Sequence, residues 1–440
     1  MSAPLLPEAL AVLTQLGILP KYIRQMPPGH RRTQCRALIN WLTRYRPPQN
    51  SNNLTQVKGY IQAAQHLCDI QEWERAFTLL CTRPNTPTQE MLHYQLKLWG
   101  YNTVRTDLYR ALAARTKNTP PDGWNARMLQ FLGESLFSQN QYSQAAQYYQ
   151  QSLEMFRAVG EPIDVGLLLG ALGDVYYAKG DYDSALSHHQ QFLRLAHEAN
   201  LSFAEGIALG SLGNLYESKG EYALAKDYHQ QHLAIARQIQ DREMEGAALG
   251  NLGSCCYSLG EFEKAIDLHH QHLTRAQQIG HRQGESNALG GLGSAYLALN
   301  DSPNSSANNS ANNNTNNSLK AEQYFIKQKE IAKEIGDLRG EAGALSGLGS
   351  VCFGKGDYEQ AITYHQKHLD IAQTLGHKEG SLHALCNLGN AYSAIGDYAN
   401  AAKRYRQQLA IAQELKDLTG EAIANDCLGA VASKASRETG

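Results

Sequence analysis

Paired histidines are the residues of this sequence whose spacing best fits metal chemistry. Three pairs stand three residues apart, and one further pair is adjacent: His229 and His232, His269 and His272, His365 and His368, His188 and His189. Residues three apart share one face of a helix, so two such imidazoles can reach one metal ion. The first histidine of each spaced pair takes a place that Tyr149, Phe325 and Tyr405 hold elsewhere in the pattern. This exchange favours a core position, and metal binding is the alternative.

Other motifs for catalysis are missing. The sequence contains no Gly-rich phosphate loop, no nucleophile elbow and no HExxH. Carboxylates do recur eight residues before a repeated glycine: Glu205, Glu245, Glu285, Glu341 and Glu421. Each would lie near the start of a helix, where the helix dipole favours negative charge, so their predicted role is structural. We therefore expect no enzyme, no catalytic residue, no metal and no cofactor. An enzymatic alternative would need a site in residues 1–120, where no motif supports one.

The elements that position these side chains are copies of one unit. Leu-Gly pairs recur every forty residues, with one step of fifty-six, and their glycines are Gly133, Gly173, Gly213, Gly253, Gly293, Gly349, Gly389 and Gly429. Around one copy, Leu209, Leu212, Gly213 and Tyr216 fall at the spacing of one helix face. Glycine inside a helix costs about 1 kcal/mol, so its return in each copy indicates close packing.

A turn and a second helix complete the unit. Five glycines stand where the first helix must end in a left-handed residue, each followed by Asp or Glu: Gly180, Gly220, Gly260, Gly356 and Gly396. The next stretch carries Tyr222, Ala225, His229 and Leu233, again at helical spacing. One such hairpin exposes apolar surface on two sides and must stack on neighbours. The predicted fold is all-α, a right-handed superhelical solenoid of antiparallel hairpins.

The chain divides into three predicted parts. Residues 1–50 form a basic helical segment and linker, 51–120 hold degenerate hairpins, and 121–436 hold seven repeats with a final capping helix. The longer step comes from an Asn/Ser-rich insertion at 300–318, predicted to be disordered because it falls at a turn and can loop into solvent.

The repeated frame resembles the tetratricopeptide repeat, and its forty-residue form is similar to that of the Pins-type G-protein-signalling modulators. The likeness is clearest in DYEQAITYHQKHLDIAQTLG at 357–376 and LGNAY at 388–392, and it spans about 124–436. In that family the first helices line a concave groove for an extended peptide, and the residue after Leu-Gly faces the groove.

The resemblance implies a set of groove residues in this chain. They are the residue after the repeated glycine and the residue three further on: Asp174, Tyr177, Asn214, Glu217, Ser254, Tyr257, Ser294, Ser350, Phe353 and Asn390. Four glycines stand four residues before this polar row, so the predicted channel has a floor of small residues: Gly170, Gly210, Gly250 and Gly290. The groove arginines common in the family are replaced by Ile207, Ala247, Asn287, Gly343, His383 and Ile423. The family's own partners are therefore not expected here.

Composition and charge limit the locations and partners that this protein can have. The formal net charge is −2, and the sequence has no apolar run long enough to span a membrane, which favours a cytoplasmic protein with neither membrane nor nucleic-acid partners. The first fifty residues carry seven Lys and Arg against Glu8 alone, so contact of the basic segment 21–46 with nucleic acid or an acidic partner is a minor alternative. The eight cysteines lack disulfide or CxxC spacing and are predicted to be reduced and buried.

The expected function is that of a scaffold or adaptor that binds an extended or helical peptide segment of a protein partner in the groove. A regulatory sensor, whose superhelix responds to a small ligand or signalling peptide, is the alternative. Self-association through the array ends or the basic segment is a third.

Overall fold

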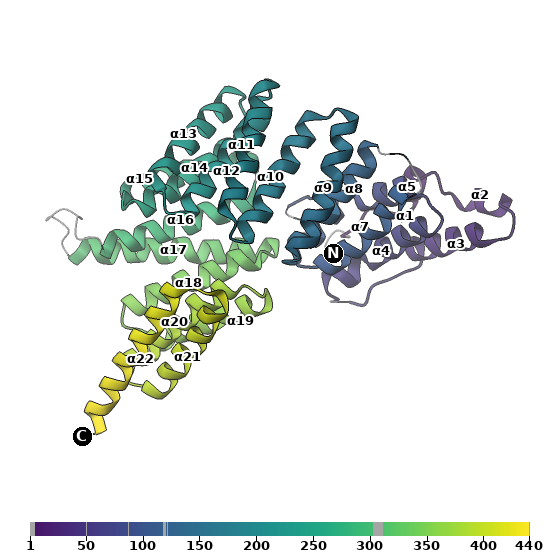
Figure 1. The fold of residues 1–440 in the computed structure, drawn as a ribbon. Coiled ribbons are helices and arrows are strands. Elements are labelled where there is room, and N and C mark those ends of the chain that lie inside the picture. The colour runs from purple at the N-terminus through teal and green to yellow at the C-terminus, as the bar shows by residue number, and fades with distance from the viewer. Residues whose placement is uncertain are drawn as a thin grey trace. The chain divides into compact units, whose positions relative to one another are not determined.

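The protein is made of helices joined by short turns. The computed structural model describes residues 5–49, 51–86, 88–117, 120, 122–301 and 311–439, and these ranges contain no strand. They fall into two compact units, Met1–Asp241 and Arg242–Gly440 (Figure 1). None of the described helices is long and apolar enough to cross a membrane. The prediction of an all-α solenoid is confirmed.

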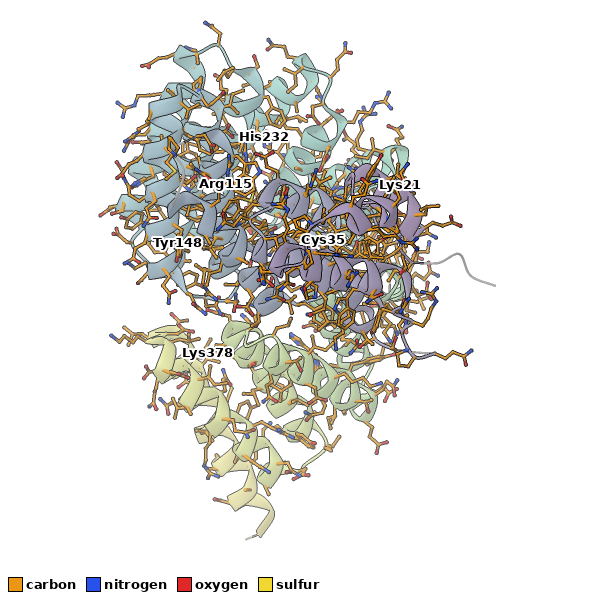
Figure 2. All side chains as sticks on the ribbon, turned by 90° about the vertical axis from the view of Figure 1, so that its right-hand side faces the viewer. Lys21, Cys35, Arg115, Tyr148, His232 and Lys378 are labelled. Carbon is orange, nitrogen blue, oxygen red and sulfur yellow. The ribbon has the colours of Figure 1, made fainter. Side chains whose placement is uncertain are left out.

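The first unit opens with a bundle of short helices. These are α1 (Ala9–Gln15), α2 (Pro20–Gln25), α3 (His30–Thr43), α4 (Asn53–Asp69), α5 (Trp73–Leu80), α6 (Leu92–Leu98) and α7 (Asn102–Ala113), followed by a short 3₁₀ helix at Ala114–Lys117. The long helix α4 packs against α3, α5 and α7. Cys35 of α3 is buried in this bundle, whereas the basic Lys21 of α2 is exposed (Figure 2).

Regular hairpins complete the first unit. They are formed by α8 (Gly123–Phe137) with α9 (Tyr142–Val159), α10 (Pro162–Ala178) with α11 (Tyr182–Glu198), and α12 (Ser202–Ser218) with α13 (Tyr222–Gln238). Each helix packs on its neighbours along the chain. One apolar core runs from Val12 of α1 to Ala208 of α12, so the irregular front bundle and the first repeats share a single interior.

The second unit continues the same pattern. Its helices are α14 (Arg242–Ser258), α15 (Phe262–Ile279), α16 (Arg282–Asp301), α17 (Ala311–Ile335), α18 (Leu338–Gly354), α19 (Tyr358–Thr374), α20 (Lys378–Ala394), α21 (Tyr398–Leu415) and α22 (Leu418–Thr439). They pair as four hairpins, and the first helices α14, α16, α18 and α20 also contact one another in sequence. The helix α22 packs on α21 at the end of this row.

The repeated glycines admit the rings of the second helices. A Cβ atom placed on Gly213 would lie 2.4 Å from the His229 ring, and one on Gly389 would lie 2.4 Å from the Tyr405 ring. Histidine, phenylalanine and tyrosine thus fill the same slot, and His229 has no exposed surface. The prediction that the first histidine of each spaced pair is a core residue is confirmed, because only glycine leaves room for the ring.

The helix ends also follow the predicted chemistry. Gly180, Gly220, Gly260, Gly356 and Gly396 all have φ between 76° and 81°, the left-handed region that favours glycine. The next residue begins the second helix, and when it is Asp its side chain caps that helix. Asp357 Oδ1 accepts a hydrogen bond from the Gln360 N–H at 3.1 Å. Glu221 and Glu261, at the equivalent place, make no such cap.

The insertion lengthens one hairpin. The helix α16 continues through Asn300 to Asp301, and α17 already begins at Ala311, while residues 302–310 lie outside the described part. Asn300 Nδ2 donates a hydrogen bond to Ser318 Oγ at 2.7 Å, which ties the extended ends together. The described ends of the insertion, 300–301 and 311–318, are therefore helical and not disordered as predicted. Packing of α16 on α17 outweighs the weak helix propensity of Asn and Ser there.

All eight cysteines are free thiols, as predicted. Cys35, Cys255, Cys256 and Cys352 are buried. The other four are half-buried, so the expectation of burial is met by only part of the set. Burial raises the pKa of the Cys68 thiol to about 12, which keeps it protonated and unreactive at neutral pH.

Candidate functional site

The predicted groove residues lie on the first helix of each hairpin, one residue and four residues after the glycine that receives the ring. In the second unit, three cavities open along α14, α16, α18 and α20. Of the ten predicted residues, these cavities are lined by Ser254, Tyr257, Ser294, Ser350, Phe353 and Asn390. The remaining four belong to the first unit and are described separately below.

Two of the cavities form one apolar channel. The first, of about 610 Å³, is lined by Tyr257, Phe262, Ser294, Leu297, Ala298, Phe325, Gly343, Ser346, Gly347 and Ser350. The second, of about 690 Å³, includes Phe353, Asn387 and Asn390, the insertion side chains Asn300 and Ser318, and Leu319 directly after the insertion. Leu297 and Ser350 line both. Because the two cavities share these walls, the channel continues from α16 to α20.

The polar side chains that line these cavities are held by hydrogen bonds within their own helix or to the second helix packed beside it. Ser350 Oγ donates to the Ser346 carbonyl at 3.1 Å, and Ser254 Oγ donates to the Gly250 carbonyl at 3.3 Å. Asn390 Oδ1 accepts a hydrogen bond from the Tyr405 hydroxyl at 2.7 Å. These contacts fix the direction of the side chains. The hydroxyl oxygens keep acceptor capacity toward a ligand.

Aromatic side chains form the rim. The Tyr257 ring lies 5.6 Å from that of Phe262, and the Phe353 ring lies 5.3 Å from that of Tyr358. Tyr257 is 39 % exposed and Phe353 is 37 % exposed, so each presents a partly open apolar face. In the first unit, Tyr177 repeats the arrangement with Tyr182, at 5.6 Å.

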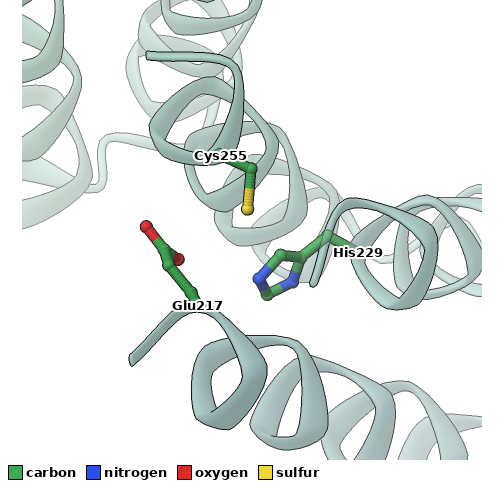
Figure 3. A group of neighbouring side chains, drawn as sticks. All are labelled: Glu217, His229 and Cys255. Carbon is green, nitrogen blue, oxygen red and sulfur yellow. The ribbon is translucent and has the colours of Figure 1, made fainter. Parts of the chain in front are cut away.

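The four predicted residues of the first unit lie on α10 and α12. Asp174 and Asn214 are exposed, and Tyr177 donates its hydroxyl hydrogen to Ser218 Oγ at 2.7 Å. Figure 3 shows Glu217 of α12 beside the buried His229 of α13; the Cys255 drawn there belongs to the second unit.

Asp174 is the one acid among the predicted groove residues of α10. Desolvation raises the pKa of its carboxyl to about 6, although 60 % of the side chain is open to solvent. Because water reaches this much of the group, we expect the carboxyl to be ionised at neutral pH. The His189 Nε2 atom lies 3.6 Å from the carboxylate.

The channel also contains residues that the sequence pattern did not predict for the groove. Phe262, Phe325 and Leu319 come from second helices, and Asn387 stands two residues before a repeated glycine. Phe262 takes the place of Tyr222 at the start of the second helix, so the repeat frame held a signal for it. Leu319 had none, because it stands directly after the insertion at the place of Glu263, a charged residue.

Two family models match the chain, and both describe the tetratricopeptide repeat. One matches residues 164–238, 245–307 and 340–414, and the other matches residues 126–159. No curated protein matches the chain significantly.

Solved structures share the fold at low sequence identity. A Rap protein complexed with competence and sporulation factor is 16 % identical with a TM-score of 0.54, and the match covers 93 % of this chain and 99 % of that one. A STAND signal-transduction ATPase with a tetratricopeptide repeat sensor, from Pyrococcus horikoshii, is 14 % identical with a TM-score of 0.53. That match covers 95 % of this chain but only 65 % of the ATPase, so this chain spans less than two thirds of its length.

The matched family models together cover more than half of the sequence, and within them each hairpin of the structure packs a second-helix ring against a first-helix glycine. By sequence and by packing, the chain belongs to the tetratricopeptide repeat family.

Proposed function

We propose that this protein is a binding scaffold whose channel on α14, α16, α18 and α20 holds an extended or helical peptide segment of a partner. The observation that carries the proposal is the continuity of the two apolar cavities through Leu297 and Ser350. Their walls combine apolar side chains with hydroxyl and amide groups that keep hydrogen-bonding capacity. Such a surface suits the alternating side chains and backbone groups of a peptide.

The charge of the channel limits the kinds of ligand that it can bind. Lys355 is the charged residue among those lining the two cavities, and its Nζ pairs with Glu322 Oε2 at 2.7 Å. Among the described lining residues, a strongly acidic ligand therefore meets no unpaired cation. This lack of an unpaired cation agrees with the replacement of the family's groove arginines by uncharged residues. The resemblance to the Pins-type modulators therefore supports the proposed position of the peptide in the groove, and it does not identify the partner.

A regulatory sensor is the second candidate. Both structural neighbours described above favour it, one by its tetratricopeptide repeat sensor and the other by its complex with competence and sporulation factor. A sensor should change its dimensions in solution on binding, whereas a rigid scaffold should not. X-ray scattering of the full chain with and without a bound peptide separates the two.

Selection from random peptides displayed on phage tests the binding proposal. We expect the full-length protein to enrich a family of peptides. The variant Ser350→Trp, which fills the junction of the cavities, should lose them. Thr363→Trp is the matched control, because Thr363 is exposed on α19 and makes the same hydrogen bond to its own helix, to the Glu359 carbonyl at 3.1 Å. Enriched peptides that bind Ser350→Trp as well as the unchanged protein would refute the proposal, provided that circular dichroism shows both variants folded.

A further inference from the structure

A second polar row recurs on the second helices, one turn after the core ring. It consists of His232, His272, Gln328, His368 and Gln408, which follow the same spacing as the repeat. All five are at most 8 % exposed, and in the described structure each has one buried side-chain atom without a hydrogen-bond partner: Nδ1 of the histidines and Oε1 of the glutamines. An unpaired buried polar atom lowers the free energy of unfolding by about 1–3 kcal/mol, so its recurrence in five repeats needs an explanation.

One member of the row lies in a pocket. Between α14 and α16 opens a cavity of about 440 Å³, and His269 and His272 of α15 line it. Glycines line both walls, Gly246 and Gly250 on α14 and Gly284 and Gly291 on α16, and all but Gly284 lie against these imidazoles. A Cβ atom on Gly250 would stand 2.8 Å from His272 Nδ1, and one on Gly291 would stand 2.5 Å from the His269 ring. Any larger residue at either place would close the pocket over the histidines.

The groups that line this pocket are mostly uncharged. Burial lowers the pKa of both His269 and His272 to about 4, so at neutral pH each ring has one N–H donor and one bare nitrogen acceptor. Asn251, Asn287 and Ser254 add neutral donors and acceptors. Arg242, Glu243 and His281 also line the pocket, and the formal charges of Arg242 and Glu243 are opposite. A matching ligand group is therefore neutral and offers both a donor and an acceptor.

We propose that the pocket between α14 and α16 binds the carboxamide of an asparagine or glutamine side chain, with His272 and His269 as its hydrogen-bond partners. The side chain would be carried by a peptide in the channel, whose lining begins one helical turn further along both helices, at Tyr257 and Ser294. A carboxamide offers a carbonyl oxygen to an imidazole N–H and an amino group to a bare imidazole nitrogen. A carboxylate can only accept, and an ammonium group can only donate. The inference rests on the proposed function, because it assumes that a peptide occupies the channel.

Selection with the phage-displayed random peptides tests the inference on the full-length protein. We expect the unchanged protein to enrich Asn or Gln at one peptide position, and His272→Leu to lose that preference. His368→Leu is the matched control, since His368 is equally buried at the same place in another repeat and does not line this pocket. Enriched peptides without an amide preference would overturn the inference and leave the proposed function standing. If no peptide is enriched at all, both fail.

Calorimetry with one enriched peptide and its counterpart, in which Asn or Gln becomes Asp or Glu, gives the second readout. The unchanged protein should bind the amide form roughly tenfold more tightly. His272→Leu and Gly250→Ala should bring the ratio close to one, and His368→Leu should keep it. If His272→Leu and His368→Leu reduced the affinity ratio equally, the role of the histidines would be structural and the inference would be overturned. So would an unchanged ratio in His272→Leu, which would mean that water alone satisfies the ring.

Discussion

At the scale of the residue, the contact between a first-helix glycine and a second-helix ring determines how closely the two helices pack. The same slot accepts His229, Phe325 or Tyr405, so ring size matters there and ring chemistry does not. A histidine in the slot nevertheless has a cost that phenylalanine lacks, because its ring must remain neutral inside the protein. The buried histidines therefore make stability depend on pH. The glycines make stability depend on the volume of the side chain at their positions.

Gly213→Ala should destabilise the protein. The new Cβ would lie 2.4 Å from the His229 ring, and this overpacking outweighs the gain in helix propensity, for a net loss of about 1–2 kcal/mol. Gly429 occupies the same place in α22, where an added Cβ would meet nothing within 4 Å. Gly429→Ala should thus raise stability by roughly 0.5–1 kcal/mol. Urea denaturation of both variants measures the difference, and a loss for Gly429→Ala would contradict the packing argument.

Acid should destabilise the histidine-bearing repeats. Desolvation lowers the pKa of His365 from 6.5 to about 4, so below pH 6.5 the unfolded chain takes up protons that the folded chain does not. The neutral His365 ring makes its full contribution to the free energy of unfolding above pH 6.5. As the pH falls toward 4, that free energy decreases by up to about 3 kcal/mol. His365→Phe should lose less stability than the unchanged protein between pH 7 and pH 5. Urea midpoints at the two pH values measure this, and equal losses would refute it.

At the scale of the element, the residue after each left-handed glycine decides how well the second helix begins. Aspartate at this place accepts a hydrogen bond from a backbone N–H of the first turn, as Asp397 does from Asn400 at 3.1 Å. Glutamate carries one more methylene group, and Glu221 makes no such bond. The sequence treats the two acids alike, but only the shorter one caps the helix.

Asp357→Ala should therefore destabilise α19 by about 1 kcal/mol. The loss comes from the hydrogen bond between Asp357 Oδ1 and the Gln360 N–H. Glu221→Ala is the comparison, since its helix α13 has no side-chain cap to lose. Thermal unfolding followed by circular dichroism should show the larger decrease for Asp357→Ala, and a larger decrease for Glu221→Ala would contradict this account of the caps.

The extended hairpin of α16 and α17 supplies one wall of the channel. Leu319 lies in α17 directly after the insertion, lines the cavity of about 690 Å³ and is 46 % exposed. Leu319→Asp should weaken the binding of a selected peptide roughly tenfold, because it places a charge against an apolar ligand side chain, and should leave folding almost unchanged. Fluorescence anisotropy with a labelled peptide measures the loss. Unaltered affinity would exclude this part of α17 from the binding surface.

At the scale of the whole molecule, stability should vary along the chain, since each repeat contacts only its neighbours. The four tryptophans, Trp41, Trp73, Trp99 and Trp124, all precede the regular histidine-bearing repeats. The buried histidines whose pKa falls to about 4 are mostly later: His93 alone comes early, and the others are His189, His229, His232, His269, His272, His365 and His368.

Acid unfolding should therefore proceed in stages. As the pH falls from 6.5 toward 4, circular dichroism, which reports all helices, should lose signal before tryptophan fluorescence changes, because the fluorescence reports the front bundle and α8. Simultaneous acid titration with both probes tests this. Coincident transitions would mean that the whole chain unfolds as one cooperative unit.

The sequence by itself determined the repeat, the two helices of each unit, the left-handed turns and the burial of the ring-slot histidines. These follow from local periodicity and from residues such as Gly180 and Gly213, whose backbone or volume demands are independent of distant contacts. The predicted groove positions came from the resemblance to the tetratricopeptide repeat, and six of them line cavities.

Only the tertiary structure decided which side chains share a cavity. The apolar channel depends on Phe325 and Leu319 lying beside first helices that are distant in sequence, and the described ends of the insertion, 300–301 and 311–318, are helical where the Asn and Ser composition predicted disorder. The pocket around His272 needed the same information, because four glycines open it from two different helices. Periodicity specifies the face on which a residue lies, whereas the space around it is set by what the neighbouring helices leave empty.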